Sequence, residues 1–250
     1  MKEMILGYGV DAYGVEECCD DVFAALRGGG KRWLACFNPH SYAESLADEH
    51  FVSALKAADW LVPDGVGVVV ASRMLGGKIA DRVTGSDIFY GLQQRMNAAG
   101  GMKVFFLGAS EETLADIRVR MARDYPGIEL AGTYSPPFKP TYSRAELDEM
   151  IAAVNAVKPD VLWVGMTAPK QEKWIHDNLP ALDVKFAGAI GAVFDFYTGR
   201  VKRSHPIFQR MGLEWLPRLL QQPRRLWRRM FVSAPIFVLH VLRQRFDGNA

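Results

Sequence analysis

The pattern of hydrophobic and polar positions alternates, over the first 199 residues, between a spacing typical of helices and one typical of buried strands. In the first helical segment, apolar residues from Val15 to Leu26 recur three and four positions apart, and glycines at 28–30 end the segment. The run Trp33–Phe37 is short and continuously apolar, which predicts a buried strand. The same alternation predicts further strands at 59–62, 103–107, 128–133, 160–164 and 184–187, and helices at 41–57, 66–75, 87–99, 111–124, 144–157 and 169–178.

This strict order of strands and helices predicts the fold class. Parallel strands need a crossover connection, the crossover is right-handed, and helices then cover both faces of the sheet. We therefore expect an α/β protein with a Rossmann-like, mostly parallel sheet over residues 1–199. After Gly199 the alternation ceases, and residues 206–245 predict helices broken by Pro217, Pro223 and Pro235. Residues 200–250 are expected to form a separate helical appendage.

The charge distribution supports that division. The whole chain carries a formal charge of +2, but residues 200–250 hold eleven Lys or Arg against two acidic residues, a local charge of +9 on a body of −7. These cations alternate with large apolar residues such as Trp227 and Phe231, which favours a membrane surface as the partner of the appendage. An oligomer contact or an RNA-binding arm remains an alternative. The longest apolar stretch, Met230–Leu242, has 13 residues, fewer than the ~20 needed to span a bilayer.

Cysteine and histidine usage indicates a reducing compartment and no metal site. The three cysteines are an odd number, and two of them, Cys18 and Cys19, are adjacent, so no disulfide framework is implied. The first residues lack the apolar run of a signal peptide, which predicts a cytoplasmic protein. The five histidines are scattered without metal-ligand spacing, and neither a metal nor another cofactor is expected.

Several familiar signatures are absent from the sequence. There is no Walker loop, G-x-S-x-G, H-E-x-x-H or C-x-x-C, which argues against classical kinases, hydrolases and zincins. Gly65 and Gly67 are followed by Val70 where a dinucleotide-binding loop has its third glycine, which disfavours an oxidoreductase. There is also no Asp-x-Asp, so a diphosphate would be bound by Arg, Lys and backbone amides.

The strongest candidate residues follow predicted strands, where the ligand edge of a parallel sheet lies. Asp64 comes directly after the strand at 59–62 and can serve as a general base, although Pro-Asp-Gly is also a common turn in which Asp64 would cap the next helix. Arg82 can bind a phosphate. Thr84 and Asp87, which follow it, can contact substrate or form an ordinary helix cap.

Two further loops have the same two interpretations. Gln171 lies just inside the helix at 169–178 and can bind sugar hydroxyls, or the loop can serve helix capping alone. The glycine-rich run from Gly188 to Asp195 lets the backbone approach a ligand closely, or its small residues can serve the packing of a helix on the sheet.

Taken in order, these motifs resemble one family. Residues 33–229 are similar to the WecG/TagA/CpsF family of glycosyltransferases, through Asn38, 63–65, 82–87, 169–172, 188–195, 212–218 and 223–226. The resemblance implies a bacterial enzyme that transfers a sugar from a UDP donor to a polyprenyl-diphosphate-linked saccharide in cell-surface polysaccharide synthesis. The sugar is N-acetylmannosamine, its uronic acid or, in some members, glucose.

The same resemblance assigns roles to residues. It implies that Asp64 is the catalytic base, that Arg82 steadies phosphate, and that Gln171 lies near the sugar. Arginines of the tail match a C-terminal appendage that closes the site and docks on the membrane. The full expected substrate-binding set is Asn38, Thr84, Asp87, Gln171, Gly188, Asp195, Arg218, Arg225 and Arg228. Many members have Thr-Pro-Asn or Thr-Leu-Asn where this chain has Cys36-Phe37-Asn38, so the role of that threonine is not carried over.

The sequence thus predicts an inverting, metal-independent glycosyltransferase, cytoplasmic and peripheral on the inner face of the plasma membrane. Its expected partners are the UDP-sugar, the polyprenyl-linked acceptor and the membrane surface, with no nucleic acid; a homo-oligomer is compatible with the sequence. The alternative is a non-catalytic nucleotide-sugar or nucleic-acid binding module that uses the basic tail as a contact arm.

Overall fold

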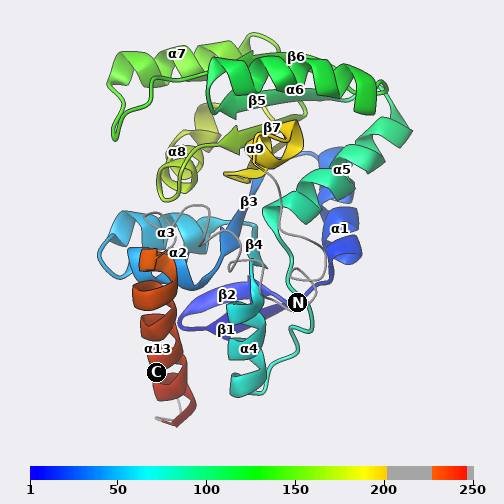
Figure 1. Ribbon diagram of the computed structural model, residues 1–250. Coiled ribbons are helices and arrows are strands. Elements are labelled where there is room, and N and C mark those ends of the chain that lie inside the picture. The colour runs from blue at the N-terminus through cyan, green and yellow to red at the C-terminus, as the bar shows by residue number, and fades with distance from the viewer. Residues whose placement is uncertain (202–226, 247–250) are drawn as a thin grey trace.

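A six-stranded sheet forms the centre of the molecule. The computed structural model describes residues 1–201 and 227–246 (Figure 1). Within them the strands are hydrogen-bonded in the order β4-β3-β8-β7-β5-β6, and every neighbouring pair is parallel. The strands are β3 (Arg32–Phe37), β4 (Trp60–Pro63), β5 (Lys103–Gly108), β6 (Glu129–Tyr134), β7 (Val161–Gly165) and β8 (Phe186–Ala189). The predicted α/β class and parallel sheet are confirmed.

Helices cover the sheet on both faces, as the crossovers require. One face carries α1 (Val15–Gly28), α5 (Gly85–Ala99), α6 (Glu111–Asp124) and α9 (Val193–Thr198). The other carries α2 (Pro39–Ser45), α3 (Glu49–Ala57), α4 (Val66–Leu75), α7 (Arg144–Asn155) and α8 (Lys170–Asn178), which a short 3₁₀ turn, η1 (Leu179–Ala181), follows.

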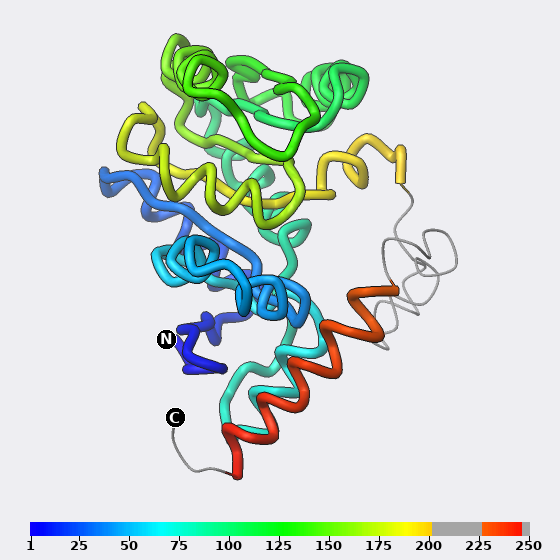
Figure 2. The backbone as a smooth tube through the Cα atoms, turned by 90° about the vertical axis from the view of Figure 1, so that its left-hand side faces the viewer, coloured from blue at the N-terminus to red at the C-terminus, as the bar shows by residue number. Residues whose placement is uncertain are grey.

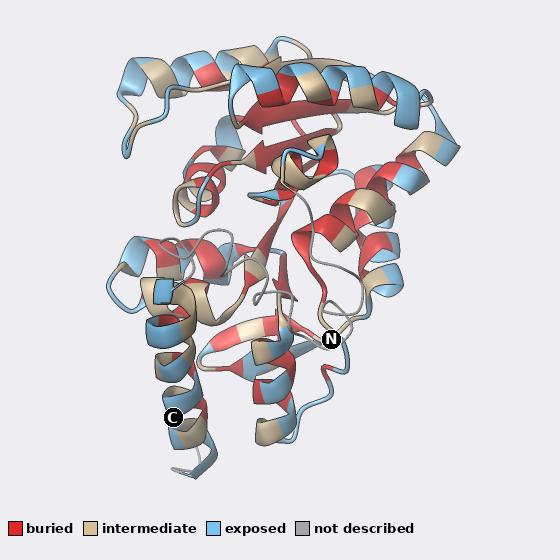
Figure 3. Cartoon of the chain, viewed as in Figure 1, coloured by how far each residue is buried: buried red, intermediate tan, exposed pale blue. Residues whose placement is uncertain are grey.

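Successive strand residues point into two different cores. In β3, Trp33, Ala35 and Phe37 pack with the second group of helices, whereas Leu34 packs with the first. In β7, Leu162 and Trp163 divide in the same way. This two-residue period follows from the pleat. Because both faces are covered, most residues of β3, β4, β5, β7 and β8 are buried, whereas the edge strand β6 is only half-buried (Figure 3).

The helix predicted at 41–57 is two helices. α2 ends at Ser45, and α3 starts again after Asp48, whose carboxylate accepts a hydrogen bond from the backbone N–H of Phe51 at 2.9 Å. An aspartate that caps a new helix competes with continuation of the old one. The prediction of a single helix was wrong for that reason.

An antiparallel hairpin at the N-terminus was not predicted. β1 (Lys2–Ile5) and β2 (Tyr8–Asp11) are joined by Leu6 and Gly7, which both have positive φ, the turn geometry that suits a two-residue hairpin. The buried carboxylate of Asp11 accepts a hydrogen bond from the backbone N–H of Leu61 at 2.7 Å. The hairpin thereby covers the edge strand β4.

The C-terminal helix packs against the body of the protein. Residues 227–246 are continuously helical, through a π-turn, η2 (Arg229–Ser233), and α13 (Ala234–Phe246), which lies along α4 (Figure 2). Pro235 does not break the helix as predicted, because the wider π-turn precedes the residue that lacks an N–H. Phe237 and Val241 are buried in the core between α2 and α4.

The described residues include no helix long and apolar enough to cross a bilayer. The predicted helices around Pro217 and Pro223 lie outside the described residues.

Candidate active site

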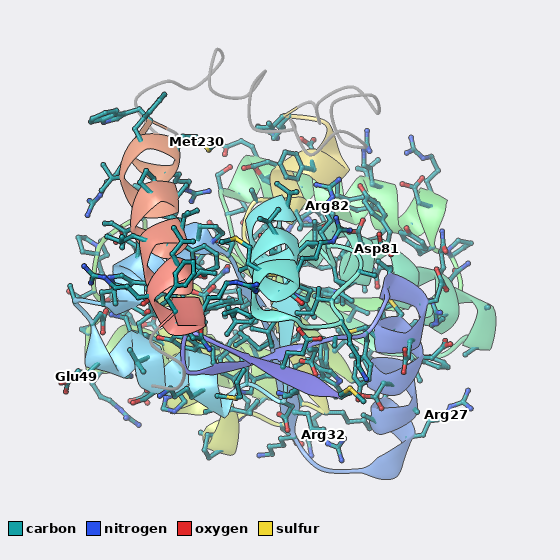
Figure 4. The ribbon with its side chains drawn as sticks, turned by 90° about the horizontal axis from the view of Figure 1, so that it is seen from below. Arg27, Arg32, Glu49, Asp81, Arg82 and Met230 are labelled. Atoms are coloured by element: carbon teal, nitrogen blue, oxygen red, sulfur yellow. The ribbon has the colours of Figure 1, made fainter. Side chains whose placement is uncertain are left out.

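A cavity of about 490 Å³ opens at the carboxyl ends of β3, β4, β7 and β8. The loops that follow these strands line it, together with the start of the C-terminal helix. Seen from below, α13 and α4 lie side by side, with Met230 at one end of the C-terminal helix and Arg82 beyond α4 (Figure 4). Both residues line the cavity. The cavity therefore lies at the edge of the sheet where the strand order predicts ligand binding.

Asp64 lies in the wall of this cavity and does not cap α4. The N-cap of α4 is Gly65, with φ 102°, and no side-chain hydrogen bond from the described residues caps the helix. Instead Oδ2 of Asp64 accepts a hydrogen bond from Nδ2 of Asn38 at 3.2 Å. The simple turn-and-cap interpretation of Pro-Asp-Gly is therefore not what the structure shows.

The capping of α2 fixes the direction of the Asn38 amide. Its Oδ1 accepts hydrogen bonds from the backbone N–H groups of His40 and Ser41, at 3.0 and 2.9 Å. Ser41 Oγ accepts from the backbone N–H of Asn38, which completes a capping box. With Oδ1 committed to the helix end, Nδ2 is left to face Asp64.

Arg82 also lines the cavity, on a loop held beside the Asp64 turn by a 2.9 Å hydrogen bond from the backbone N–H of Val83 to the carbonyl of Pro63. Thr84 and Asp87 cap α5 reciprocally: the Asp87 carboxylate accepts from the N–H and hydroxyl of Thr84, at 3.0 and 2.7 Å. Thr84 reaches the cavity wall, whereas Asp87 is not in the lining of the described cavity.

Gln171 and Glu172 enter the cavity from the first turn of α8. Oε1 of Gln171 accepts a hydrogen bond from the backbone N–H of Gly191 at 3.0 Å, and its Nε2 donates to Oε1 of Glu172 at 2.9 Å. Burial raises the pKa of Glu172 to about 7, and the hydrogen bond from Gln171 opposes that rise.

Three other predicted residues lie away from the described lining. A Cβ on Gly188 would fall 2.4 Å from the Trp163 ring, so this glycine serves packing inside the sheet. Asp195 lies in the first turn of α9, and the backbone N–H of Val201 donates to its carbonyl. Arg228 forms a surface ion pair with Glu44 at 3.5 Å. Arg218 and Arg225 lie outside the described residues.

The structure adds four residues that lie outside the expected catalytic and substrate-binding set. Cys36, His40, Glu172 and Arg229 all line the cavity. Burial lowers the pKa of His40 to about 4, with the charge of Arg229 acting in the same direction. Nδ1 of His40 lies 3.1 Å from Oγ of Ser233, which connects α2 to the C-terminal helix. The three-residue spacing of Asn38 and Ser41 is a capping-box pattern that could have indicated the start of a helix at this loop. The sequence contains no comparable signal that Glu172 is buried.

Two histidines treated as scattered are in fact neighbours. Nε2 of His50 and Nδ1 of His176 lie 2.7 and 3.1 Å from Oδ1 of Asp177, on the surface between α3 and α8. These residues are not in the lining of the described cavity.

A carboxylate and guanidinium groups line a cavity at the carboxyl edge of a parallel α/β sheet, an arrangement suited to a group-transfer enzyme. The comparison with known families shows that the chain is one, and which group it transfers. The chain belongs to the WecG/TagA/CpsF family of glycosyl transferases, whose family model matches residues 3–250. It is a glycosyltransferase, and the resemblance found in the sequence is confirmed.

Three relatives are each named N-acetylglucosaminyldiphosphoundecaprenol N-acetyl-beta-D-mannosaminyltransferase. The Bacillus spizizenii protein is 36% identical over 211 residues, 84% of this chain and 79% of the relative. The Bacillus subtilis protein is 30% identical over 213 residues, again 84% and 79%. A Staphylococcus aureus protein is 26% identical over 248 residues, 98% of this chain and 93% of the relative.

Proposed function

We propose that this protein is an inverting, metal-independent transferase that moves N-acetylmannosamine from a UDP donor onto a polyprenyl-diphosphate-linked saccharide. The names of the Bacillus and Staphylococcus relatives support both the sugar and the acceptor class. The uronic acid of N-acetylmannosamine and glucose are the other donors that the sequence resemblance allows.

Asp64 acts as the base in this proposal. Its carboxylate takes the proton from the acceptor hydroxyl while the hydroxyl oxygen bonds to the anomeric carbon, and the bond from that carbon to UDP breaks with its electron pair leaving on the phosphate. One displacement of this kind turns an α-linked donor into a β-linked product. The observation that carries the proposal is the hydrogen bond from Asn38, which holds Asp64 at the cavity wall and away from the helix it precedes.

Arginine side chains supply the positive charge that stabilises the departing, negatively charged UDP. Arg82 and Arg229 both line the cavity. Arg82 lies on the loop between α4 and α5, and Arg229 lies on the C-terminal helix. Guanidinium groups bind phosphate oxygens in a bidentate way and stabilise the charge that develops as the glycosidic bond breaks. The sequence has no Asp-x-Asp to hold a divalent ion at the same place.

The C-terminal helix is the membrane-docking element. Its outer face exposes Trp227, Phe231, Val238 and Leu239 beside Arg228 and Arg243. Apolar area enters the interface and cations are attracted to anionic headgroups at about 1 kcal/mol each. In this proposal the enzyme works at the inner face of the plasma membrane, where a polyprenyl-linked acceptor resides.

The test is transfer in the presence of EDTA. Purified full-length protein, UDP-N-acetylmannosamine and a polyprenyl-diphosphate-linked N-acetylglucosamine should give a β-linked disaccharide lipid, detected by mass spectrometry and assigned by NMR. Product that forms only after a divalent metal is added back contradicts metal independence, and an α-linked product contradicts inversion.

A further inference from the structure

Glu172 is a buried carboxyl group whose bonding the fold leaves incomplete. Only 2% of the residue is exposed. Oε1 accepts the hydrogen bond from Gln171, but Oε2 has no hydrogen-bond partner among the described residues. An unsatisfied buried oxygen destabilises the folded chain, so a group of this kind inside a cavity wall calls for a ligand that completes its bonding.

The local sequence explains why the fold does not satisfy this group. Glu172 is the third residue of α8, the position from which a glutamate ordinarily reaches back to the N–H of the N-cap residue. Here the N-cap is Pro169, which has no N–H to donate. The carboxyl group therefore remains available to the cavity that it lines.

No described cation compensates the charge of Glu172. The rise of its pKa to about 7 has burial as its main cause, and the contributions that lower it are the side chain of Gln171 and the backbone N–H of Glu172 itself. Gln171 is in turn fixed by the hydrogen bond from the backbone N–H of Gly191. The Gln171 amide is thus held between the loop and the carboxyl group, and it orients Glu172.

Glu172, Asp64 and Cys36 all line the cavity. After burial itself, the charges of Asp64 and Glu172 raise the pKa of the Cys36 thiol. Two carboxylates repel a phosphate group but suit a neutral sugar, which carries several O–H donors and, in an N-acetyl sugar, an amide N–H. The two carboxylates in the lining therefore match the transferred sugar better than the diphosphate.

We propose that Glu172 recognises the transferred sugar, with its Oε2 accepting a hydrogen bond from a hydroxyl or the amide N–H of the sugar ring and Gln171 positioning it. The assignment rests on the proposed function and adds to it the residue that distinguishes a UDP-sugar from UDP alone. Asp64 keeps the role of base toward the acceptor.

The test compares UDP with UDP-N-acetylmannosamine on Glu172→Gln and Glu172→Met variants of the full chain. Calorimetric titration should show UDP affinity within twofold of wild type and at least a tenfold loss for UDP-N-acetylmannosamine. The donor KM should rise by a similar factor. Without ligand, both variants should melt at or above the wild-type temperature, because a buried charge has been removed. Glu49→Gln, an exposed substitution on α3, serves as the control and should change none of these values.

Three outcomes separate the possible failures. Lower melting temperatures together with equal losses for UDP and UDP-N-acetylmannosamine indicate a purely structural role and overturn the assignment. Wild-type transfer with an unchanged donor KM in both variants overturns the role of Glu172 alone. If wild type neither binds UDP-N-acetylmannosamine nor forms product, the proposed function fails, and the assignment fails with it.

Discussion

Asn38 donates a hydrogen bond from Nδ2 to Oδ2 of Asp64 at 3.2 Å while its Oδ1 caps α2. The orientation of the proposed base is thus set by a helix cap on the neighbouring strand's loop. A substitution of Asn38 that keeps the oxygen capping α2 but replaces the Nδ2 hydrogen-bond donor can therefore separate an effect on stability from an effect on catalysis.

Asn38→Asp is that change. The new carboxylate still accepts from the backbone N–H groups of His40 and Ser41, but it places a second negative charge against Asp64, which raises the pKa of Asp64. We expect activity at pH 7 to fall about tenfold or more, with partial recovery at higher pH and a change in unfolding free energy below about 1 kcal/mol. A pH–rate profile measures the shift.

The control for this variant is Asp48→Asn, which alters the cap of α3 outside the described cavity lining. It should leave the acid limb of the profile in place. An unshifted profile in Asn38→Asp would show that the hydrogen bond does not tune Asp64.

Asp64→Asn should lower turnover, whereas Asp87→Asn should lower the stability of the fold. The first removes the proposed base and should lower kcat by about 10² or more, while UDP affinity measured by calorimetry is retained. The second weakens the hydrogen bonds that Asp87 accepts from Thr84 and should cost about 1 kcal/mol in urea unfolding, with kcat kept within a few-fold. The interpretation of Asp87 as a cap is contradicted if its variant folds normally but loses turnover.

Stability should fall in acid because of His40. Its pKa is lowered to about 4 by burial and by Arg229 and Arg228, against the opposing charge of Glu44. The unfolded chain takes up a proton near pH 6.5 and the folded chain does not, so stability is complete above about pH 6.5 and is lost as the pH falls toward 4. The loss from this group is about 2 kcal/mol by pH 5.

Urea unfolding of wild type and His40→Asn at pH 7.5 and pH 5 isolates this contribution. The pH 5 penalty should be smaller in the variant by about that amount. Equal pH dependence in both proteins would exclude His40 as the source.

Trp227→Ser with Phe231→Ser tests membrane docking. Their side chains are exposed, at 56% and 60%, and their rings lie 6.0 Å apart on the outer face of the C-terminal helix. Removing both should reduce pelleting with anionic liposomes by at least about tenfold, since burial of one large apolar side chain contributes roughly 1.5–3 kcal/mol. The control, Val119→Ser on α6, removes another exposed apolar residue and should not affect pelleting. Undiminished pelleting of the double variant would exclude this face.

The sequence predicted the sheet and most of its helices because their signals are local. A run such as Trp33–Phe37 or the Val15–Leu26 stripe reports its own burial within a few residues. The placement of Asp64 at the ligand edge followed from strand order alone. Asn38, Arg82, Thr84 and Gln171 were brought to the same cavity as expected.

What the sequence could not supply depends on residues far apart in the chain. Whether Asp64 caps α4 or faces the cavity is decided by Asn38, 26 positions away. The pKa of His40 is lowered first by its burial and then by the charge of Arg229, on a helix that His40 contacts at Ser233, 193 positions away. Gly188 looked suited to a ligand, but the Trp163 ring occupies the space beside it. Glu172 gives no signal until its burial and the missing N–H of Pro169 are seen together.

The C-terminal helix contacts both α2, which begins directly after Asn38, and α4, which begins two residues after Asp64. A displacement of α13 therefore acts on both sides of the Asn38–Asp64 pair. If the proposed membrane docking through this helix and the proposed role of Asp64 hold, an enzyme detached from lipid is expected to work with a less well-defined base.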